Sequence, residues 1–272
     1  NHAILKSSLQ TVFCDIDDSL NIDPNILRNL ITKDTKCLIF VGIGGNPQNL
    51  SEVAQICKEN DIKLILDAAH MSGCKIEGVH VGGESDVAVY SFQAVKNLPT
   101  ADSGMICFKE DSFDSKARKL SWLGIDKDTY SRSSEGNYKW DYDVIGIGEK
   151  IHGNAIIAAM GIIGLRYLDE DNLYRQHLSS LYDKYLNDSF LTVKHMPGTS
   201  RHLYQIFVED RQFIIDKLAS CGIYTGVHYK SNLSYSMFKN CSLPVTEKNH
   251  VRILSLPLHL HLTDESIQFI SN

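Results

Sequence analysis

Lys96 and Asp67 are the residues of this chain whose types and positions most clearly suggest chemistry. Asp67 ends the apolar stretch Ile62–Asp67, and Lys96 lies on a short segment between two later apolar stretches. A lysine amine can form a Schiff base with an aldehyde cofactor, and a carboxylate can keep a pyridine nitrogen protonated. These are the two protein groups that pyridoxal phosphate (PLP) chemistry needs most, so the pair predicts a site for that cofactor.

Each of the two residues also has an ordinary structural explanation. Aspartate is a good N-cap, so Asp67 has a role at the start of a following turn or helix, and Lys96 has one as a surface lysine. The neighbouring sequence favours the chemical explanation of Asp67 and Lys96. Ser91 precedes Lys96 by a few residues, and its hydroxyl can bind a phosphate. A lysine on this short loop is also expected to point back over the strand ends, towards Asp67.

Short apolar stretches alternate with helical patterns in the first half of the chain. Uniformly apolar strands separated by helices predict a mostly parallel α/β sheet with helices on both faces. Ligands of such sheets bind at the carboxyl ends of the strands, where Asp67 and Ser91 lie. The predicted strands are Thr11–Asp15, Cys37–Val41, Lys63–Leu66, Val87–Ser91 and Met105–Phe108, and the predicted helices are Pro24–Ile31, Asn49–Asn60 and Ser112–Trp122.

The second half of the chain has a different pattern. Gly124–Asp143 is polar and aromatic and predicts a long irregular loop, of the kind that often carries function. Helices are predicted at Asn154–Leu168 and Asp171–Leu186. A smaller α+β part is then predicted from His202–Val208, Arg211–Cys221, Arg252–Leu256 and Thr263–Ile270. We therefore expect a large cofactor-binding domain over residues 1–168 and a small domain over 169–272.

A glycine-rich turn, Gly42–Gly45, lies between a predicted strand and a predicted helix. A dinucleotide-binding loop is one interpretation, because the next strand ends in an acid, Asp67. That fingerprint needs a third Gly or Ala where this chain has Pro47. A tight strand-to-helix loop beside the pocket is the favoured interpretation.

The bulk composition excludes several classes of protein. A net charge of −6 and a pI near 6.0 argue against nucleic-acid binding. The apolar stretches are too short or too interrupted by glycine to predict a membrane span, and the first residues lack a signal-peptide pattern. The seven cysteines form no Cys-x-x-Cys pair, which favours the reducing cytoplasm, and the histidines show no metal-ligand spacing.

Several segments along the chain resemble the DegT-type sugar-nucleotide aminotransferases, which are PLP enzymes of fold type I. The similar segments are Val12–Asp17 with Asn21–Pro24, Asp67–His70, Ser91–Phe92 with Lys96–Thr100, Ser103–Met105, Gly148–Asn154 with Ala158–Ala159, Gly222–Ile223 with Val227–Tyr229, and Leu254–Leu258 with Leu262–Asp264. No single segment is specific, but the combination is. The resemblance implies the fold-type-I architecture with a mostly parallel central sheet and a smaller C-terminal α+β domain.

The resemblance also implies roles for individual residues. Lys96 is the expected Schiff-base lysine and proton carrier, and Asp67 the expected partner of the pyridinium nitrogen. Ser91 is expected to bind the phosphate and His70 to contact the cofactor ring or its 3′-oxygen. A second set of expectations concerns the dimer and the substrate: Lys150 or Asn154 reaches the cofactor of the neighbouring subunit of a homodimer, and His228 and Tyr229 lie near the substrate.

The activity implied is amino transfer from an amino acid, with L-glutamate as the expected donor, to a keto group of a nucleotide-linked 6-deoxyhexose. Lys96 separates this chain from related dehydratases, which have histidine at that position. Neither the sugar nor the choice between C3 and C4 follows from the sequence.

The chain departs from the family pattern in three places. The glycine-rich turn replaces a more usual polar-aromatic loop, and Gly124–Tyr142 is longer than in compact members. No counterpart of the family's N-terminal phosphate-binding turn is present before Asn1, so we expect an N-terminally incomplete cofactor domain. A truncated, non-catalytic homologue that acts as a subunit or nucleotide-sugar-binding protein therefore stays open as the alternative, and an unrelated α/β binding domain is the third interpretation.

Overall fold

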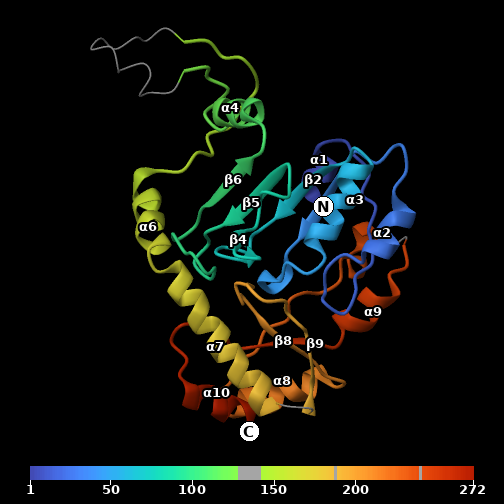
Figure 1. Cartoon of the computed structure of the whole chain (residues 1–272), viewed down its shortest axis with the longest axis vertical. Helices are drawn as coiled ribbons and strands as arrows, with labels where there is room; N and C mark the ends of the chain where they lie inside the picture. The colour runs from blue at the N-terminus through green and yellow to red at the C-terminus, as the bar shows by residue number, and fades with distance from the viewer. Residues whose placement is uncertain (128–141, 187–188, 239–240) are drawn as a thin grey trace.

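The structure is a computed structural model that describes residues 1–127, 142–186, 189–238 and 241–272. The chain forms two parts, each with its own hydrophobic core, and the long helix α7 (Leu168–Leu186) runs from one to the other (Figure 1). Most of the predicted irregular loop Gly124–Asp143 falls in 128–141, outside the described residues. The domain boundary at residue 168 stays a prediction.

The larger part is built on a four-stranded sheet. Its strands are β1 (Cys37–Val41), β2 (Lys63–Asp67), β5 (Val87–Ser91) and β6 (Gly104–Phe108), in the order β1-β2-β5-β6. The first three are parallel and β6 is antiparallel to β5. The predicted mostly parallel sheet is therefore confirmed, and its four strands coincide closely with the apolar stretches of the sequence.

Helix α3 (Leu50–Glu59) covers one face of this sheet. It turns the apolar side chains Leu50, Val53 and Ile56 towards Phe40 and Leu66, all of them buried in the first core. Apolar residues that recur at helical spacing give such a helix one buried face. Helix α2 (Pro24–Leu30) packs beside α3, and Asp23 caps its first turn by accepting a hydrogen bond from the Asn25 N–H, as is typical of an Asp before a Pro at the first helical position.

The other face of the sheet is partly open. Val41, Asp67, Val89 and Ile106 are paired across the four strands, so their side chains share this face at one level of the sheet. Val41, Val89 and Ile106 are exposed, so the helical cover predicted for both faces is incomplete here among the described residues. Asp67 therefore lies on an accessible surface between apolar side chains.

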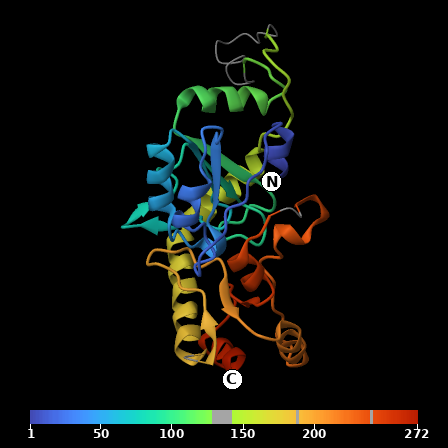
Figure 2. The ribbon, with the colours of Figure 1, turned by 90° about the vertical axis from the view of Figure 1, so that its right-hand side faces the viewer.

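Shorter elements complete the larger part. The sequence patterns did not predict the β3–β4 hairpin, because strands of two residues are too short to show a period. These elements are α1 (His2–Lys6), η1 (Ile43–Gly45), β3 (Lys75–Ile76), β4 (Val79–His80), α4 (Asp111–Leu120) and α6 (Ala155–Leu165). Figure 2 shows α4 at one end of the molecule and the C-terminal elements at the other.

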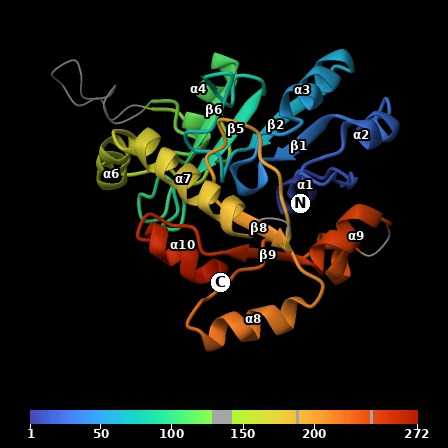
Figure 3. The ribbon, with the colours of Figure 1, turned by 60° about the horizontal axis from the view of Figure 1, so that its bottom comes forward.

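The smaller part has an antiparallel sheet of β7 (Leu191–Thr192), β8 (Tyr204–Phe207) and β9 (Ile253–Leu256). Every residue of β8 and β9 is buried, and the second half of α7 supplies Leu178, Tyr182 and Leu186 to the same core. Around this sheet lie α8 (Arg211–Ser220), α9 (Pro244–His250) and α10 (Asp264–Ser271) (Figure 3). Two short helical turns, η3 (Asn232–Ser234) and η4 (Ser236–Phe238), precede α9.

Three predicted elements differ in the structure. Thr11–Asp15 is not a strand: no strand among the described residues pairs with it, and the nearby ladder is a single bridge between Ile16 and Ile22. An apolar stretch becomes a strand only where a neighbour accepts its hydrogen bonds. The helix predicted over Asn154–Leu168 ends at Leu165, and α7 begins at Leu168 rather than at Asp171.

Asp15 joins the N-terminal segment to the smaller part. This carboxylate is 3% exposed and accepts hydrogen bonds from the N–H of Val245 (2.9 Å), the N–H of Thr246 (2.9 Å) and the Thr246 hydroxyl (2.6 Å) at the start of α9. Burial alone raises the pKa of the Asp15 carboxyl, but hydrogen bonds from Thr246, Val245 and Ile16 outweigh it and hold the pKa below its usual value.

We expect Asp15→Asn to lower the free energy of unfolding by about 1–3 kcal/mol, because donors at α9 lose a charged acceptor. Since the folded-state pKa is lowered, the carboxylate stabilises the fold above its unfolded pKa of about 3.9, and this stabilisation is lost as the pH falls through the folded-state value. Urea unfolding of both proteins at several pH values checks this. Exposed Asp18→Asn is the control, and a gap between parent and D15N that does not shrink below about pH 4 contradicts it.

Candidate active site

Asp67 stands at the carboxyl end of β2, on the open face of the sheet. One of its oxygens, Oδ1, accepts a hydrogen bond from the Ala69 N–H at 3.1 Å. The ordinary role of holding the turn after the strand is therefore real. The hydrogen bond from Ala69 uses Oδ1, and the other carboxylate oxygen of Asp67 stays available on the same surface. The structural and the chemical interpretations of Asp67 are therefore compatible.

Lys96 lies on the loop that connects β5 to β6. The loop is held by backbone hydrogen bonds from Lys96 N–H to Gln93 O (2.9 Å) and from Thr100 N–H to Phe92 O (2.8 Å). Burial lowers the pKa of the Lys96 amine, and the negative charge of nearby Asp67 opposes that shift only in part. The amine therefore lies within electrostatic range of Asp67, and loses its proton more readily than an exposed lysine amine does.

His70 lies one turn beyond Asp67 and is 7% exposed. Its Nδ1 accepts a hydrogen bond from the Gly44 N–H at 3.2 Å, and its Nε2 is 3.3 Å from the Tyr229 hydroxyl. Burial, reinforced by the positive charge of Lys96 and by His228, lowers the pKa of His70 to about 3. The ring is therefore neutral at physiological pH.

Ser91 ends β5 opposite Gly104 of β6, on the same face as Asp67. Its hydroxyl oxygen accepts a weak hydrogen bond from the Gln93 N–H at 3.4 Å, and the residue is partly exposed. Ser91 therefore brings a hydroxyl to the same edge of the sheet as Asp67. No phosphate contact is tested by the structure, so the role of Ser91 stays a prediction.

His228 and Tyr229 approach the site from the smaller part. His228 Nδ1 lies 2.9 Å from the Ser255 hydroxyl of β9, and its carbonyl accepts from the Gln205 side chain of β8 at 2.9 Å. Tyr229 stacks beside His70 with ring centres 6.2 Å apart. The structure thus brings residues that are far apart in sequence next to Asp67, Lys96 and His70. Their contact with a substrate stays a prediction.

Lys150 and Asn154 lie elsewhere. Lys150 is exposed, with its amine 5.5 Å from the centre of the Trp122 ring. Asn154 caps α6 by accepting hydrogen bonds from the N–H groups of Ile156 (3.0 Å) and Ile157 (3.1 Å). None of these described contacts joins them to the cluster around Asp67, which leaves their predicted role at a neighbouring subunit untested.

A buried polar network behind Lys96 was not predicted from the sequence. The amide nitrogen of Asn97 donates to Asn172 Oδ1 (2.8 Å) and Ser200 O (2.7 Å), and its oxygen is 2.9 Å from His202 Nδ1. The His202 ring lies 4.2 Å from that of His70. The adjacency of Asn97 to Lys96 was the one available signal, because the other partners are distant in the chain.

The glycine-rich turn is a junction between the two parts. Gly44 O accepts from His202 N–H (2.9 Å), Gly45 O accepts from the Thr199 hydroxyl (2.6 Å), and the Ser200 hydroxyl donates to His70 O (2.7 Å). The Gly44 N–H is used by His70, so it is not directed at a dinucleotide. The turn is the tight strand-to-helix loop that we favoured from the sequence.

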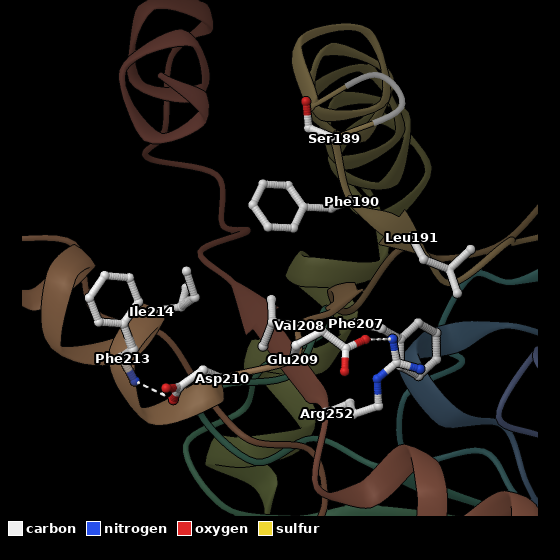
Figure 4. A pocket seen from close by; sticks show the side chains of 10 residues that line it. All are labelled: Ser189, Phe190, Leu191, Phe207, Val208, Glu209, Asp210, Phe213, Ile214 and Arg252. Carbon is white, nitrogen blue, oxygen red and sulfur yellow. Dashed lines mark hydrogen bonds and ion pairs between the residues drawn. The ribbon is translucent and has the colours of Figure 1, made fainter.

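A cavity of about 380 Å³ lies in the smaller part and does not coincide with this cluster. Arg252 and Glu209 form an ion pair in its wall, and Phe207 and Phe213 also line it (Figure 4). It contains no residue that the sequence singled out for chemistry. In the described ranges, no group of three His, Cys, Asp or Glu residues is arranged to hold a metal ion.

The side chains around Asp67 fit pyridoxal phosphate by their chemistry. Asp67 supplies a carboxylate for a pyridinium nitrogen, Lys96 an amine of lowered pKa, and Ser91 a hydroxyl at the sheet edge. His70 presents a neutral ring beside them. On the open face of the sheet, Val41 and Val89 flank Asp67 with apolar surface that would contact the cofactor ring.

Comparison with known proteins supports the same assignment. The model of the DegT/DnrJ/EryC1/StrS aminotransferase family matches residues 1–272. The chain belongs to this family. A relative from Saccharopolyspora spinosa, a dTDP-4-dehydro-2,3,6-trideoxy-D-glucose 4-aminotransferase, is 30% identical over 281 aligned residues, which cover 100% of this chain and 73% of the relative.

Solved structures of aminotransferases share the fold. The aminotransferase TlmJ from Streptoalloteichus hindustanus matches with a TM-score of 0.90 and 28% identity, covering 99% of this chain and 73% of its own. Spr1654 from Streptococcus pneumoniae, solved in a PLP form, matches with a TM-score of 0.87 and 26% identity, covering 99% and 75%. The expected fold type, the aminotransferase class and the PLP cofactor are therefore confirmed for this family member.

We expect Gly45→Ala to destabilise the junction. Gly45 has φ +82°, and an added Cβ would lie 2.0 Å from Ser200 Oγ and 2.7 Å from His70 O. Gly78→Ala is a matched control, because Gly78 has φ +83° with open space around its Cβ position. Both variants carry backbone strain, but only G45A adds overpacking, of about 1–3 kcal/mol. Equal losses in urea unfolding of the two variants would contradict this account.

Proposed function

We propose that this chain transfers an amino group from L-glutamate to the keto group of a nucleotide-linked 6-deoxyhexose. The observation that carries the proposal is the placement of Asp67 and Lys96 together at the carboxyl ends of the sheet, with the amine at lowered pKa. The Saccharopolyspora spinosa relative acts on a dTDP-linked keto sugar at C4, which supports a substrate of that class.

Lys96 and Asp67 have separate tasks in this reaction. When bound, pyridoxal phosphate supplies an aldehyde that reacts with amines and a ring that takes up electrons from the reacting carbon. Asp67 holds the proton on the pyridine nitrogen, which keeps the ring electron-withdrawing. The Lys96 amine removes a proton from the amino donor and delivers one to the acceptor carbon, and its lowered pKa suits both steps.

His228 and Tyr229 form the substrate side of the site in this proposal. Burial lowers the pKa of His228, and the charge of Lys96 adds to that shift. Burial also raises the pKa of the Tyr229 hydroxyl, and nearby Asp67 adds to it, so this residue keeps its proton. Neutral hydrogen-bonding groups of this kind suit the hydroxyl and keto oxygens of a sugar.

A homodimer with shared active sites is part of the proposal. Helix α6 contains no charged residue and none of its residues is buried, although its sequence is apolar all round. Isolated helices of this kind are normally covered by protein, and large exposed apolar patches mark interaction sites. Lys150 and Asn154 immediately precede α6, so a second copy packed on this helix would receive them near its own site. Its exposed residues include Ile156, Met160, Ile162, Ile163 and Leu165.

The cytoplasm is the proposed location. All seven cysteines are free in the structure, as the reducing cytoplasm favours. Among the described residues, no helix has the length and apolar character needed to cross a bilayer.

Lys96→Ala should lose PLP labelling and turnover, because the amine that bonds to the cofactor and carries the proton is gone. The measurement is the visible absorbance with added PLP, followed by borohydride reduction and peptide mapping. The parent should carry the reduced cofactor on the Lys96 peptide, and exposed Lys116→Ala should behave like the parent. Label spread over surface lysines would refute the site, and sugar binding without turnover by the parent would favour the non-catalytic alternative.

Ile162→Lys on α6 should weaken the homodimer, since it places a charge in the proposed interface. Phe269→Lys on α10 is the control, because Ile162 and Phe269 are similarly exposed, at 59% and 61%. Sedimentation velocity should show a dimer for the parent and for F269K, and a shift towards monomer for I162K. A monomeric parent, or a dimer that I162K leaves intact, would contradict this interface.

A further inference from the structure

The hydrogen bonds around His70 determine which of its nitrogens carries a proton. A backbone N–H can only donate, so the Gly44 N–H at 3.2 Å requires an unprotonated Nδ1. A neutral imidazole then has its hydrogen on Nε2. The Tyr229 oxygen at 3.3 Å from Nε2 is therefore the acceptor of that hydrogen. The hydroxyl hydrogen of Tyr229 is left to bond elsewhere.

We infer that Gly44 fixes the tautomer of His70, and that His70 in turn directs the hydroxyl hydrogen of Tyr229 to an oxygen atom of the bound ligand. Gly44 and His70 are positioning residues in this relation, and Tyr229 is the group that touches the ligand. The statement about the ligand oxygen deepens the proposed function and rests on it. The tautomer of His70 is a property of the protein without ligand and does not depend on that function.

Three features of the site support donation of the Tyr229 hydroxyl hydrogen to a ligand. The Tyr229 side chain is 51% exposed on the side of Asp67, and no second partner of its hydroxyl occurs among the described hydrogen bonds. The His70 ring cannot turn over freely, because it is buried and its centre lies 4.2 Å from that of the tilted His202 ring. The neutral state of His70 follows from the same burial, which lowers its pKa to about 3.

His202 provides an internal comparison because its tautomer is the opposite one. Both amide hydrogens of Asn97 are donated, to Asn172 and to Ser200, so the Asn97 oxygen must accept from His202 Nδ1. Two neighbouring histidines therefore carry their protons on different nitrogens, His70 on Nε2 and His202 on Nδ1. This gives a pattern that a misassigned or protonated ring would not reproduce.

The tautomers are tested by long-range ¹H–¹⁵N correlation spectra of the ¹⁵N-histidine-labelled chain without ligand at pH 7. His70→Gln identifies the His70 signals, and Tyr229→Phe tests the contact. We expect a protonated Nε2 for His70, a protonated Nδ1 for His202, and a shift of the His70 Nε2 signal in Y229F that leaves the His202 tautomer unchanged. A protonated His70 Nδ1, or no response to Y229F, would overturn the inference.

The ligand oxygen is tested separately with Y229F and added PLP. If Tyr229 donates to the phenolic oxygen of the cofactor, the pH at which the visible band changes form should shift relative to the parent. If it donates to the sugar, the band should be unchanged and KM for the keto sugar should rise roughly tenfold, as loss of one such hydrogen bond implies. The inference is overturned if neither the visible band nor KM changes in Y229F.

The side chain at position 70 provides the rescue test. His70→Gln keeps a donor close to the Nε2 position and should retain most of whichever Tyr229-dependent property the previous test detects. His70→Leu keeps similar bulk but has no donor, and should resemble Y229F. Equal behaviour of H70Q and H70L would show that His70 acts only by filling space. Failure of Lys96 labelling in the parent would count against the proposed function and leave the ligand-free spectra unaffected.

Discussion

The close approach of Gly44 and Gly45 to segment 199–203 is the constraint on which the site depends. Asp67, His70 and Lys96 belong to the larger part, whereas His202, His228 and Tyr229 belong to the smaller one. The carbonyls of Gly44 and Gly45 accept hydrogen bonds from the His202 N–H and the Thr199 hydroxyl, and a side chain at position 45 would be excluded by Ser200 and by His70 O. Glycine is therefore needed for packing rather than for a bound nucleotide, and the turn that resembles a phosphate loop instead sets the distance between the two halves of the site.

Burial around a single carboxylate gives the site its electrostatic character. It lowers the pKa of Lys96, His70, His202 and His228, so bases that are commonly cationic are held closer to neutrality. Asp67 stays on the accessible face of the sheet, where water and one backbone N–H can stabilise its charge. His70, with a pKa of about 3, stays neutral near physiological pH and acts through hydrogen bonds. The lowered pKa of Lys96 instead brings that amine closer to the operating pH, which suits a group that must both accept and donate a proton.

Much of the fold could be predicted from the sequence, because long strands and helices have periods that a single segment displays. The four strands of the larger sheet, helix α3 and the cap at Asp23 follow from local patterns. The strand predicted at Thr11–Asp15 was wrong, because a strand forms only where a neighbouring strand pairs with it. The local sequence pattern carries no information about that neighbour. Lys96 and Asp67 were found through their chemistry, whereas Asn97 and His202 act through distant partners such as Asn172 and Ser200. Whether a histidine beside such a site is a ligand contact or part of a buried network is decided by packing alone.

Two of the accessible apolar surfaces in the described part of the chain suit different occupants. The row of Val41, Val89 and Ile106 flanks a carboxylate, and an open surface with one fixed charge suits a flat aromatic ligand that has a polar edge. Helix α6 has no polar group for orientation, but it has glycines that permit close approach: Gly161 and Gly164 contact Thr100 and Leu98 on the loop that carries Lys96. In the proposed homodimer, a second copy on the outer side of α6 would therefore be separated by this one helix from the loop that carries Lys96.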